Sequence, residues 1–337
     1  MSKIVVTGGL GFIGSNLIEL LLEKNFYVIN IDNCGYASSS YNFNQYNKIK
    51  NYKFIKVDLN NKSKVFKILK THKPKGIFHL AASTHVDRSI ENPIDFINNN
   101  ILATYNLLES IREYSKINKK YKLIHVSTDE IYGDLVKGKA SEISYINPSS
   151  PYAASKASSN HLVTSYVRTF KLNAVVTNSS NNYGPRQHPE KLIPKLIYNI
   201  LHGKNLPIYG SGNNIREWIY VKDHCNALLK IFKKGKKGQI YNIGSGKLVS
   251  NLYLCKKILN LSRKKKILKK DIKIIHVKDR AGHDFRYSLN SLKLKTKIKW
   301  KNKTNLTNGL IKTLDWYFKN QNFFKEFKKS DITRRIG

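Results

Sequence analysis

The segment from Lys3 to Lys24 constrains the fold of this 337-residue chain more than any other. Its sequence, KIVVTGGLGFIGSNLIELLLEK, joins an apolar run to a helical pattern through a glycine-rich turn. Glycines between a buried strand and a helix let backbone N–H groups approach a pyrophosphate at the positive end of that helix. The turn therefore predicts a dinucleotide site. The contacts expected from it are Gly8, Gly11, Phe12, Ile13 and Gly14.

Strand and helix patterns alternate through the first half of the chain. Apolar runs predict strands at 3–7, 27–32, 52–58, 76–81, 122–128 and 173–178, and helical periodicity appears at 12–24, 63–71, 94–115 and from 152 onward. Such alternation with short connections is typical of an α/β fold, a Rossmann-type doubly wound parallel sheet covered on both faces. After residue 179 proline and glycine become frequent, which predicts a smaller C-terminal α/β substrate lobe closed by an amphipathic segment at 306–320. We expect an NAD-binding Rossmann domain at 1–180, with contributions near 219–243, and the second lobe at 181–330.

Asp32 ends the second predicted strand and follows the glycine turn by 18 residues. A carboxylate at this position accepts hydrogen bonds from the adenosine ribose and repels a 2′-phosphate, which favours NAD over NADP. Asp58 ends the third strand, where it either meets the adenine or simply caps the strand. Leu59 and Ala81 are the remaining residues expected at the cofactor.

Tyr152 and Lys156 are spaced i, i+4 in YAASK and should share one helix face. A tyrosine base needs its pKa lowered from about 10 toward 7, or roughly 4 kcal/mol. One ammonium about 4 Å away supplies roughly that much at an effective dielectric near 20. Because the pair follows a glycine turn and the strand segment STDEIYG, we expect it to be catalytic.

Seven segments together resemble the extended short-chain dehydrogenase/reductase family, and within it the dTDP-glucose 4,6-dehydratases. They are HLAASTHVDRSI (79–90), STDEIYG (127–133), PSSPYAASKAS (148–158), SSNNYGPRQHPEKLIP (179–194), LPIYGSGNNIREWIYVKDH (206–224), YNIGSG (241–246) and DRAGHDFRY (279–287). The resemblance implies a nucleotide-sugar lyase with bound NAD. Its expected reaction converts dTDP-glucose to dTDP-4-keto-6-deoxyglucose and water by C4 oxidation, C5/C6 elimination and hydride return to C6 from the same NADH.

The acid pair in STDEIYG distinguishes this branch from its relatives. Loss of water from a 4-keto sugar needs a base for the C5 proton and an acid for the C6 hydroxyl. Two carboxyls confined together push their pKa values apart, so one can stay protonated while the other is ionised. The resemblance implies that Asp129 is the acid, that Glu130 is the base, and that Thr128 binds the C4 oxygen beside Tyr152.

The resemblance also implies a set of substrate contacts in the second half of the chain and near residue 85. They are His85, Thr128, Asn181, Lys191, Arg216, Asn251, Arg280 and His283. Ala281, Phe285 and Ser83-Thr84 depart from the family pattern, so a UDP-, CDP- or GDP-linked hexose is an alternative substrate. A 4-epimerase and a non-catalytic dinucleotide-sensing or polyanion-binding protein are further alternatives. The acid pair argues against the epimerase, and the intact acid and Tyr-Lys pairs together argue against the non-catalytic protein.

The net charge of +38 comes from 60 basic and 22 acidic residues. Lysines are spread along the chain and arginines are few, so we expect no specific nucleic-acid partner, although the field should attract an anionic substrate. Three cysteines without CxxC spacing indicate neither disulfides nor a metal site, and no apolar run reaches about 18 residues. With no signal sequence recognised, we expect a cytoplasmic enzyme. The resemblance implies a homodimer through the helices near 94–115 and 151–170, and deoxysugar biosynthesis, such as that of rhamnose, as the destination.

Overall fold

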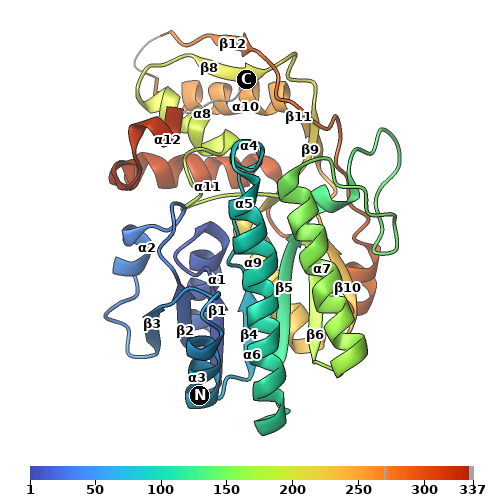
Figure 1. Ribbon diagram of the computed structural model, residues 1–337. Coiled ribbons are helices and arrows are strands. Elements are labelled where there is room, and N and C mark those ends of the chain that lie inside the picture. Colours follow the sequence, from blue (N-terminus) through green and yellow to red (C-terminus); the bar gives the residue numbers. More distant parts are fainter. Residues whose placement is uncertain (269–270, 334–337) are drawn as a thin grey trace.

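The computed structural model describes residues 1–268 and 271–333. A parallel sheet of seven strands lies at its centre, in the order β10-β6-β5-β4-β1-β2-β3 (Figure 1). The strands are β1 (Lys3–Thr7), β2 (Tyr27–Asp32), β3 (Tyr52–Lys56), β4 (Gly76–His79), β5 (Lys122–Thr128), β6 (Ala174–Ser179) and β10 (Ile240–Ile243). The doubly wound parallel sheet expected from the sequence is confirmed. Asp58 and Ala81 lie two residues beyond their strands rather than at the strand ends.

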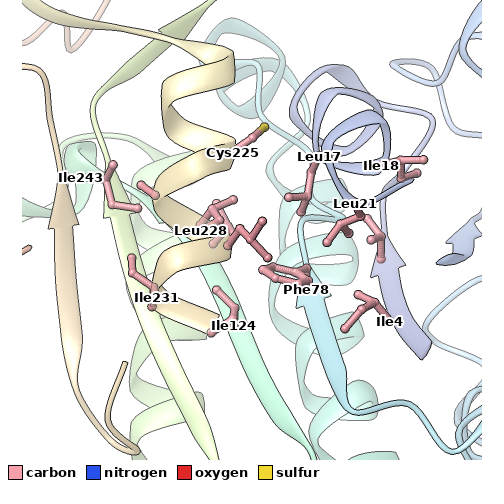
Figure 2. Packing of buried hydrophobic residues seen from close by; sticks show 14 of the residues in the cluster. Ile4, Leu17, Ile18, Leu21, Phe78, Ile124, Cys225, Leu228, Ile231 and Ile243 are labelled. Atoms are coloured by element: carbon pink, nitrogen blue, oxygen red, sulfur yellow. The ribbon is translucent and has the colours of Figure 1, made fainter. Parts of the chain in front are cut away.

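Both faces of the sheet are covered by helices, which explains why its strands are apolar on both sides. On one face, α1 (Phe12–Glu23) packs against α9 (Val221–Lys234), and Leu17, Leu21 and Leu228 bury their side chains with Phe78 of the sheet (Figure 2). On the other face, three helices cover a second apolar cluster. They are α3 (Lys62–His72), α6 (Ala103–Ile117) and α7 (Pro151–Phe170).

The long helix expected at 94–115 is present as one continuous helical stretch of α5 (Pro93–Phe96), a π-helical segment η1 (Ile97–Leu102) and α6. A shorter helix, α4 (Val86–Glu91), precedes it. Asn100 of η1 is buried, and its side chain donates to the Ser83 carbonyl at 3.0 Å and to Ser155 Oγ at 2.8 Å. These bonds tie the segment to the loop after β4 and to α7, a local irregularity often found beside functional sites.

The second lobe has its own apolar cluster and two small sheets. One sheet holds β7 (Asn181–Tyr183), β9 (Ile215–Tyr220) and β11 (Leu248–Ser250), and the other pairs β8 (Leu206–Tyr209) with β12 (Ile274–Val277). Its helices are α8 (Leu192–Leu201), α10 (Asn251–Lys264), α11 (Leu306–Lys319) and α12 (Lys329–Thr333). Shorter elements are α2 (Ser40–Asn44), η2 (Asp129–Tyr132), η3 (Leu294–Ile298) and η4 (Gln321–Glu326).

The chain crosses from the second lobe back to the central sheet. β9 leads directly into α9, and β10 then pairs in parallel with β6. Among the described residues no helix is both long and apolar enough to cross a membrane, and no group of histidines, cysteines and acids could hold a metal ion. Cys34, Cys225 and Cys255 are all free thiols.

Candidate active site

The carboxyl ends of β1, β2, β4, β5 and β6 meet at one edge of the sheet, which borders a cavity of about 410 Å³. Ligands of open parallel sheets bind at this edge. Every residue expected at the cofactor lines the cavity. They are Gly8, Gly11, Phe12, Ile13, Gly14, Asp32, Asp58, Leu59, Ala81, Tyr152 and Lys156.

The glycine turn leaves the N-terminus of α1 open toward this cavity. Gly8 has φ +71°, and a Cβ there would lie 2.7 Å from the backbone of Ala81. A Cβ on Gly14 would overlap the carbonyl oxygen of Gly8. Gly11 is the N-cap of α1 and has no side chain to cover the first N–H groups of the helix. This arrangement fits a pyrophosphate, because those N–H groups and the helix dipole favour an anion.

Asp32 is buried at the end of β2 and organises the loop that follows it. Its carboxylate accepts hydrogen bonds from the backbone N–H of Leu10 at 3.0 Å and of Cys34 at 2.8 Å, and from Ser38 Oγ at 2.7 Å. Asp58 accepts from the N–H of Asn60 at 2.8 Å, as a loop cap does. Since both carboxylates still line the cavity, their lone pairs fit the hydroxyl and amino donors of an adenosine.

Tyr152 and Lys156 lie on the first two turns of α7, which begins at Pro151. Ser150 caps the helix by accepting from the Ala153 N–H at 3.1 Å, and this fixes where the tyrosine enters the cavity. Both side chains are buried and line the same cavity. The Lys156 ammonium donates to the Val126 carbonyl at 2.9 Å, and burial lowers its pKa to about 8.

The pKa of Tyr152 differs from the expectation drawn from the Tyr-Lys spacing. Burial raises it well above 10, and the carboxylate of Glu130 raises it further, while contact with Thr128 lowers it. The expected lowering came from the lysine alone, whereas the surrounding acids and the desolvation of the phenol act in the opposite direction. The phenol therefore holds its proton firmly unless further positive charge comes near it.

Asp129 and Glu130 follow β5 on the short helix η2. Thr128 caps this helix, since its hydroxyl oxygen accepts from the Glu130 N–H at 3.3 Å. The same hydroxyl lies 3.3 Å from Asp129 Oδ1 and donates to it, whereas Asp129 Oδ2 is buried with no hydrogen-bond partner among the described residues.

The two acids of this pair have different electrostatic surroundings. Burial raises the pKa of Asp129 well above its usual range, and Glu130 and Glu217 add to the effect. Burial also raises the pKa of Glu130, but Arg280, Arg216 and Lys191 oppose it. Asp129 is thus the better proton holder and Glu130 the better anion, which is the division needed for one acid and one base.

A second cavity of about 200 Å³ adjoins the first and lies between the central sheet and the second lobe. Glu130, Asn181, Glu190 and Lys191 line both cavities. Thr128 lines the first cavity, and the other seven expected substrate residues line the second: His85, Asn181, Lys191, Arg216, Asn251, Arg280 and His283. The side-chain oxygens of Asn181 and Asn251 are buried without a partner in the described part of the chain, so both amides have capacity for a ligand.

The cations of the second cavity are held by the protein. Arg216 donates to the carbonyls of Ile215, Phe285 and Asp284 at 2.8–3.1 Å, and its guanidinium lies 4.3 Å from the ring centre of Tyr287. Arg216 therefore lines the cavity as expected, and several of its N–H groups also position the segment after β12.

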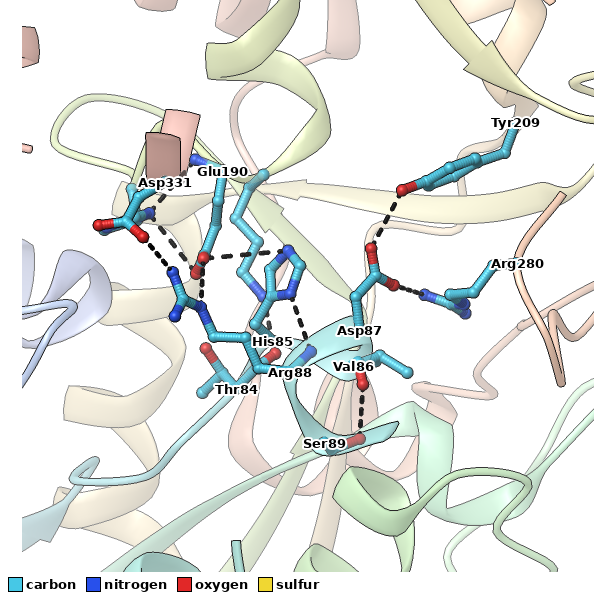
Figure 3. A network of polar contacts seen from close by, with 12 residues as sticks. Thr84, His85, Val86, Asp87, Arg88, Ser89, Glu190, Tyr209, Arg280 and Asp331 are labelled. Atoms are coloured by element: carbon cyan, nitrogen blue, oxygen red, sulfur yellow. Dashed lines mark hydrogen bonds and ion pairs between the residues drawn. The ribbon is translucent and has the colours of Figure 1, made fainter. Parts of the chain in front are cut away.

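Arg280, His283 and Lys191 are anchored in the same way. Arg280 lies 3.5 Å from Asp87, and His283 Nδ1 lies 2.7 Å from Asp279 (Figure 3 shows the first pair). Lys191 donates to the Thr84 carbonyl at 2.7 Å. Held cations of this kind keep a fixed geometry for an anionic ligand.

Several cavity residues were missed by the sequence argument. Glu190 precedes Lys191 in PEKLIP and Tyr287 ends DRAGHDFRY, so both lay within quoted segments and could have been found there. Tyr36, Ser38 and Trp218 also line a cavity. Tyr36 and Ser38 carry no motif, since only the path of the loop after β2 brings them to the site.

Comparisons with known proteins agree with this geometry. The family model for GDP-mannose 4,6 dehydratase matches residues 5–313. A probable dTDP-glucose 4,6-dehydratase of Sinorhizobium fredii is 42% identical over 332 residues, covering 94% of this chain and 93% of that protein.

Two solved structures extend the comparison to three dimensions. A dTDP-glucose 4,6-dehydratase of Bacillus anthracis in complex with NAD superposes with a TM-score of 0.87 at 37% identity, covering 97% of this chain and all of that one. A Streptomyces venezuelae dTDP-glucose 4,6-dehydratase with NAD and TYD bound gives 0.90 at 35% identity, with the same coverage of both chains.

Proposed function

This chain belongs to the nucleotide-sugar 4,6-dehydratase family that includes the dTDP-glucose 4,6-dehydratases, and we propose that it removes water from dTDP-glucose to give dTDP-4-keto-6-deoxyglucose. The observation that carries this proposal is the buried acid pair beside Tyr152, with Asp129 favoured as the protonated partner and Glu130 as the anion. An enzyme that only oxidises and re-reduces C4 has no use for such a pair.

The cofactor is NAD. The open helix end at Gly11, the close approach at Gly8 and Gly14, and the carboxylate of Asp32 fit its pyrophosphate and ribose. The chemistry that bound NAD supplies is a hydride acceptor beside C4, from which the hydride returns to C6. Residues 1–180, with 219–243, are proposed to hold it, and residues 181–330 to hold the nucleotide sugar.

The side chains of this site divide the proton transfers between them. Tyr152 would take the proton of the C4 hydroxyl as a phenolate, stabilised by the positive charges of Lys156 and of the bound oxidised nicotinamide, and Thr128 binds the same oxygen and orients it. Lys156 supplies positive charge on the same helix face. The resulting ketone acidifies C5, so Glu130 removes that proton while Asp129 donates one to the departing C6 hydroxyl.

The second cavity is proposed to hold the diphosphate and the nucleotide. Lys191, Arg216 and Arg280 provide fixed positive charge, and the amide oxygens of Asn181 and Asn251 provide acceptors. His85 and His283 complete its wall. Ala281, Phe285 and Ser83-Thr84 depart from the family pattern, and these departures leave UDP-, CDP- and GDP-hexoses as the alternative substrates.

The test is a product assay in heavy water with dTDP-, UDP-, CDP- and GDP-linked hexoses. The expected product is a 4-keto-6-deoxy sugar that carries solvent deuterium at C5, formed fastest from dTDP-glucose. An epimerised hexose without solvent label would show a 4-epimerase instead. Tight NAD binding with no turnover of any sugar would favour a dinucleotide-sensing protein.

A homodimer is also proposed. Ile94, Ile97, Leu102 and Tyr105 expose large apolar side chains along α5, η1 and α6, and Phe170 does so on α7, which lies beside α6 (Figure 1). Such a patch is typical of an interface. Sedimentation of the parent as a dimer and of Tyr105→Glu as a monomer would support it. Three free thiols are consistent with the further proposal of a cytoplasmic location.

A further inference from the structure

Arg88 of α4 lies behind the wall between the two cavities and joins two carboxylates (Figure 3). Its Nε donates to Glu190 Oε2 at 3.0 Å, and its Nη2 donates to Asp331 Oδ1 of α12 at 2.9 Å. The guanidinium also lies 4.3 Å from the ring centre of Tyr36. Arg88 itself lines neither of the two cavities. Its position is therefore fixed from three sides without contact to the space that a ligand would fill.

Glu190 is the partner that faces the ligand space. It is buried, lines both cavities and precedes Lys191 in the sequence. A buried carboxylate at this junction would repel an anionic ligand unless a nearby cation balances it. The net charge of the cavity wall thus depends on which cation pairs with Glu190 on its side away from the cavities.

The two histidines near Glu190 do not provide that cation. His188 Nδ1 accepts from the Glu190 N–H at 3.2 Å, and burial lowers the pKa of His188 to about 4. His85 Nδ1 accepts from the Arg88 N–H at 3.4 Å, and burial lowers its pKa far below its usual value. Both rings are uncharged at neutral pH. The other groups that face Glu190 are Arg88, Lys191 and Tyr36.

A second acid of the substrate cavity is balanced in a similar way. Asp87 lies 3.5 Å from Arg280 Nη1 and accepts from the Tyr209 hydroxyl at 3.1 Å. With Asp87 and Glu190 both paired, Glu130 is left as the carboxylate of this cavity that faces the reacting sugar. Such an arrangement leaves a net positive wall for a diphosphate.

We propose that Arg88 is a positioning residue that neutralises Glu190 from behind the cavity wall and so sets the affinity of the site for the diphosphate of its substrate, with Asp331 holding the guanidinium in place. The inference rests on the proposed function for the identity of the ligand. Arg88 would then influence how tightly the ligand binds although it lies outside both cavities.

The test measures dTDP binding by isothermal titration calorimetry to the purified, NAD-containing protein. Arg88→Met should raise the Kd for dTDP on the order of tenfold, because one unpaired charge then faces the diphosphate. Arg88→Met with Glu190→Gln should restore the Kd to within about threefold of the parent, and Glu190→Gln alone should tighten binding about threefold or more. Lys265→Met, which breaks an exposed ion pair with Asp315, is the matched control and should change nothing.

Asp331→Asn should weaken dTDP binding about threefold in the parent and not at all in Arg88→Met, because it acts through the guanidinium. A purely structural role for Arg88 would lower the melting temperature and the NAD content, and Glu190→Gln would not repair either. An unchanged Kd in Arg88→Met, or no recovery in the double variant, overturns the inference.

Glu190→Gln and the parent protein keep the test decisive if Arg88→Met does not fold or if the proposed function fails. If Arg88→Met does not fold, Glu190→Gln decides alone, and unchanged or weaker dTDP binding in that variant overturns the inference. If the parent neither binds dTDP nor converts dTDP-glucose, the proposed function has failed. Normal conversion by the parent with an unaltered Arg88→Met affinity means that only the role of Arg88 is wrong.

Discussion

Replacing Asp129 by asparagine separates the two halves of the proposed reaction. Asp129 is 3% exposed, and burial together with Glu130 and Glu217 raises its pKa well above the usual range, so it holds a transferable proton more readily than an ordinary carboxyl. Asparagine keeps the shape and the oxygen that faces Thr128 Oγ1 at 3.3 Å, but it has no acidic proton. Since a positioned general acid contributes about 10²–10⁴-fold, water loss should slow by at least about 10²-fold. Oxidation at C4, which uses Tyr152, should change less than about threefold.

Stopped-flow absorbance at 340 nm with dTDP-glucose measures this directly. The variant should build up reduced cofactor within one turnover and release 4-keto-6-deoxy product slowly, whereas the parent should show little build-up. Asp134→Asn is the matched control, because that exposed acid accepts from the Arg286 N–H at 2.8 Å outside both cavities. Product formation at the parent rate without a rise in absorbance would refute the acid role of Asp129.

The pKa of the Asp129 carboxyl is higher in the folded protein than the 3.8 of the unfolded chain, so its contribution to stability is present below pH 3.8 and is lost as the pH rises. Asp129→Asn should therefore melt at a higher temperature than the parent at pH 8 and lose that advantage near pH 3. Equal melting curves at pH 8 would contradict this prediction. His79 and His224 are buried with pKa values lowered to about 3, so between pH 6.5 and 3 the unfolded chain binds more protons than the folded one. The melting temperature should therefore fall as the pH is lowered through that window, and less steeply in His224→Gln. Gly14→Ala forces a Cβ into the carbonyl of Gly8, so the purified variant should lose bound NAD, seen as a lower 260 to 280 nm absorbance ratio; full NAD content would contradict the close approach.

The central fold and the cofactor cavity were predictable because their signals are local. A glycine turn between a strand and a helix, an acid at the end of β2 and an i, i+4 pair on α7 each need only a few adjacent residues. The π-helical geometry of η1 within the long helix was not predictable, because the bonds of its residue Asn100 go to Ser83 and Ser155 far away in the sequence.

The pKa values and bonding of the site residues were harder to predict from the sequence than the identity of those residues. The i, i+4 spacing predicts Lys156 next to Tyr152, but not that burial and Glu130 raise the pKa of Tyr152, because desolvation depends on every residue that encloses the phenol. Arg216 was expected at the substrate, and the sequence did not reveal that carbonyls of residues 284 and 285 accept from it. Tyr36 and Arg88 carry no motif, and only tertiary contacts bring them to the site.

The pairing of β10 with β6 has a consequence for any attempt to divide the protein. β10, residues 240–243, pairs with one side of β6 from Val176 to Ser179. In the sequence β10 comes only after β7 and β9 of the second lobe. A fragment ending near residue 180 would therefore carry a bare, apolar strand margin and would lack α9, which packs against α1. Such margins recruit other chains, so the fragment should precipitate rather than serve as an autonomous nucleotide-binding module.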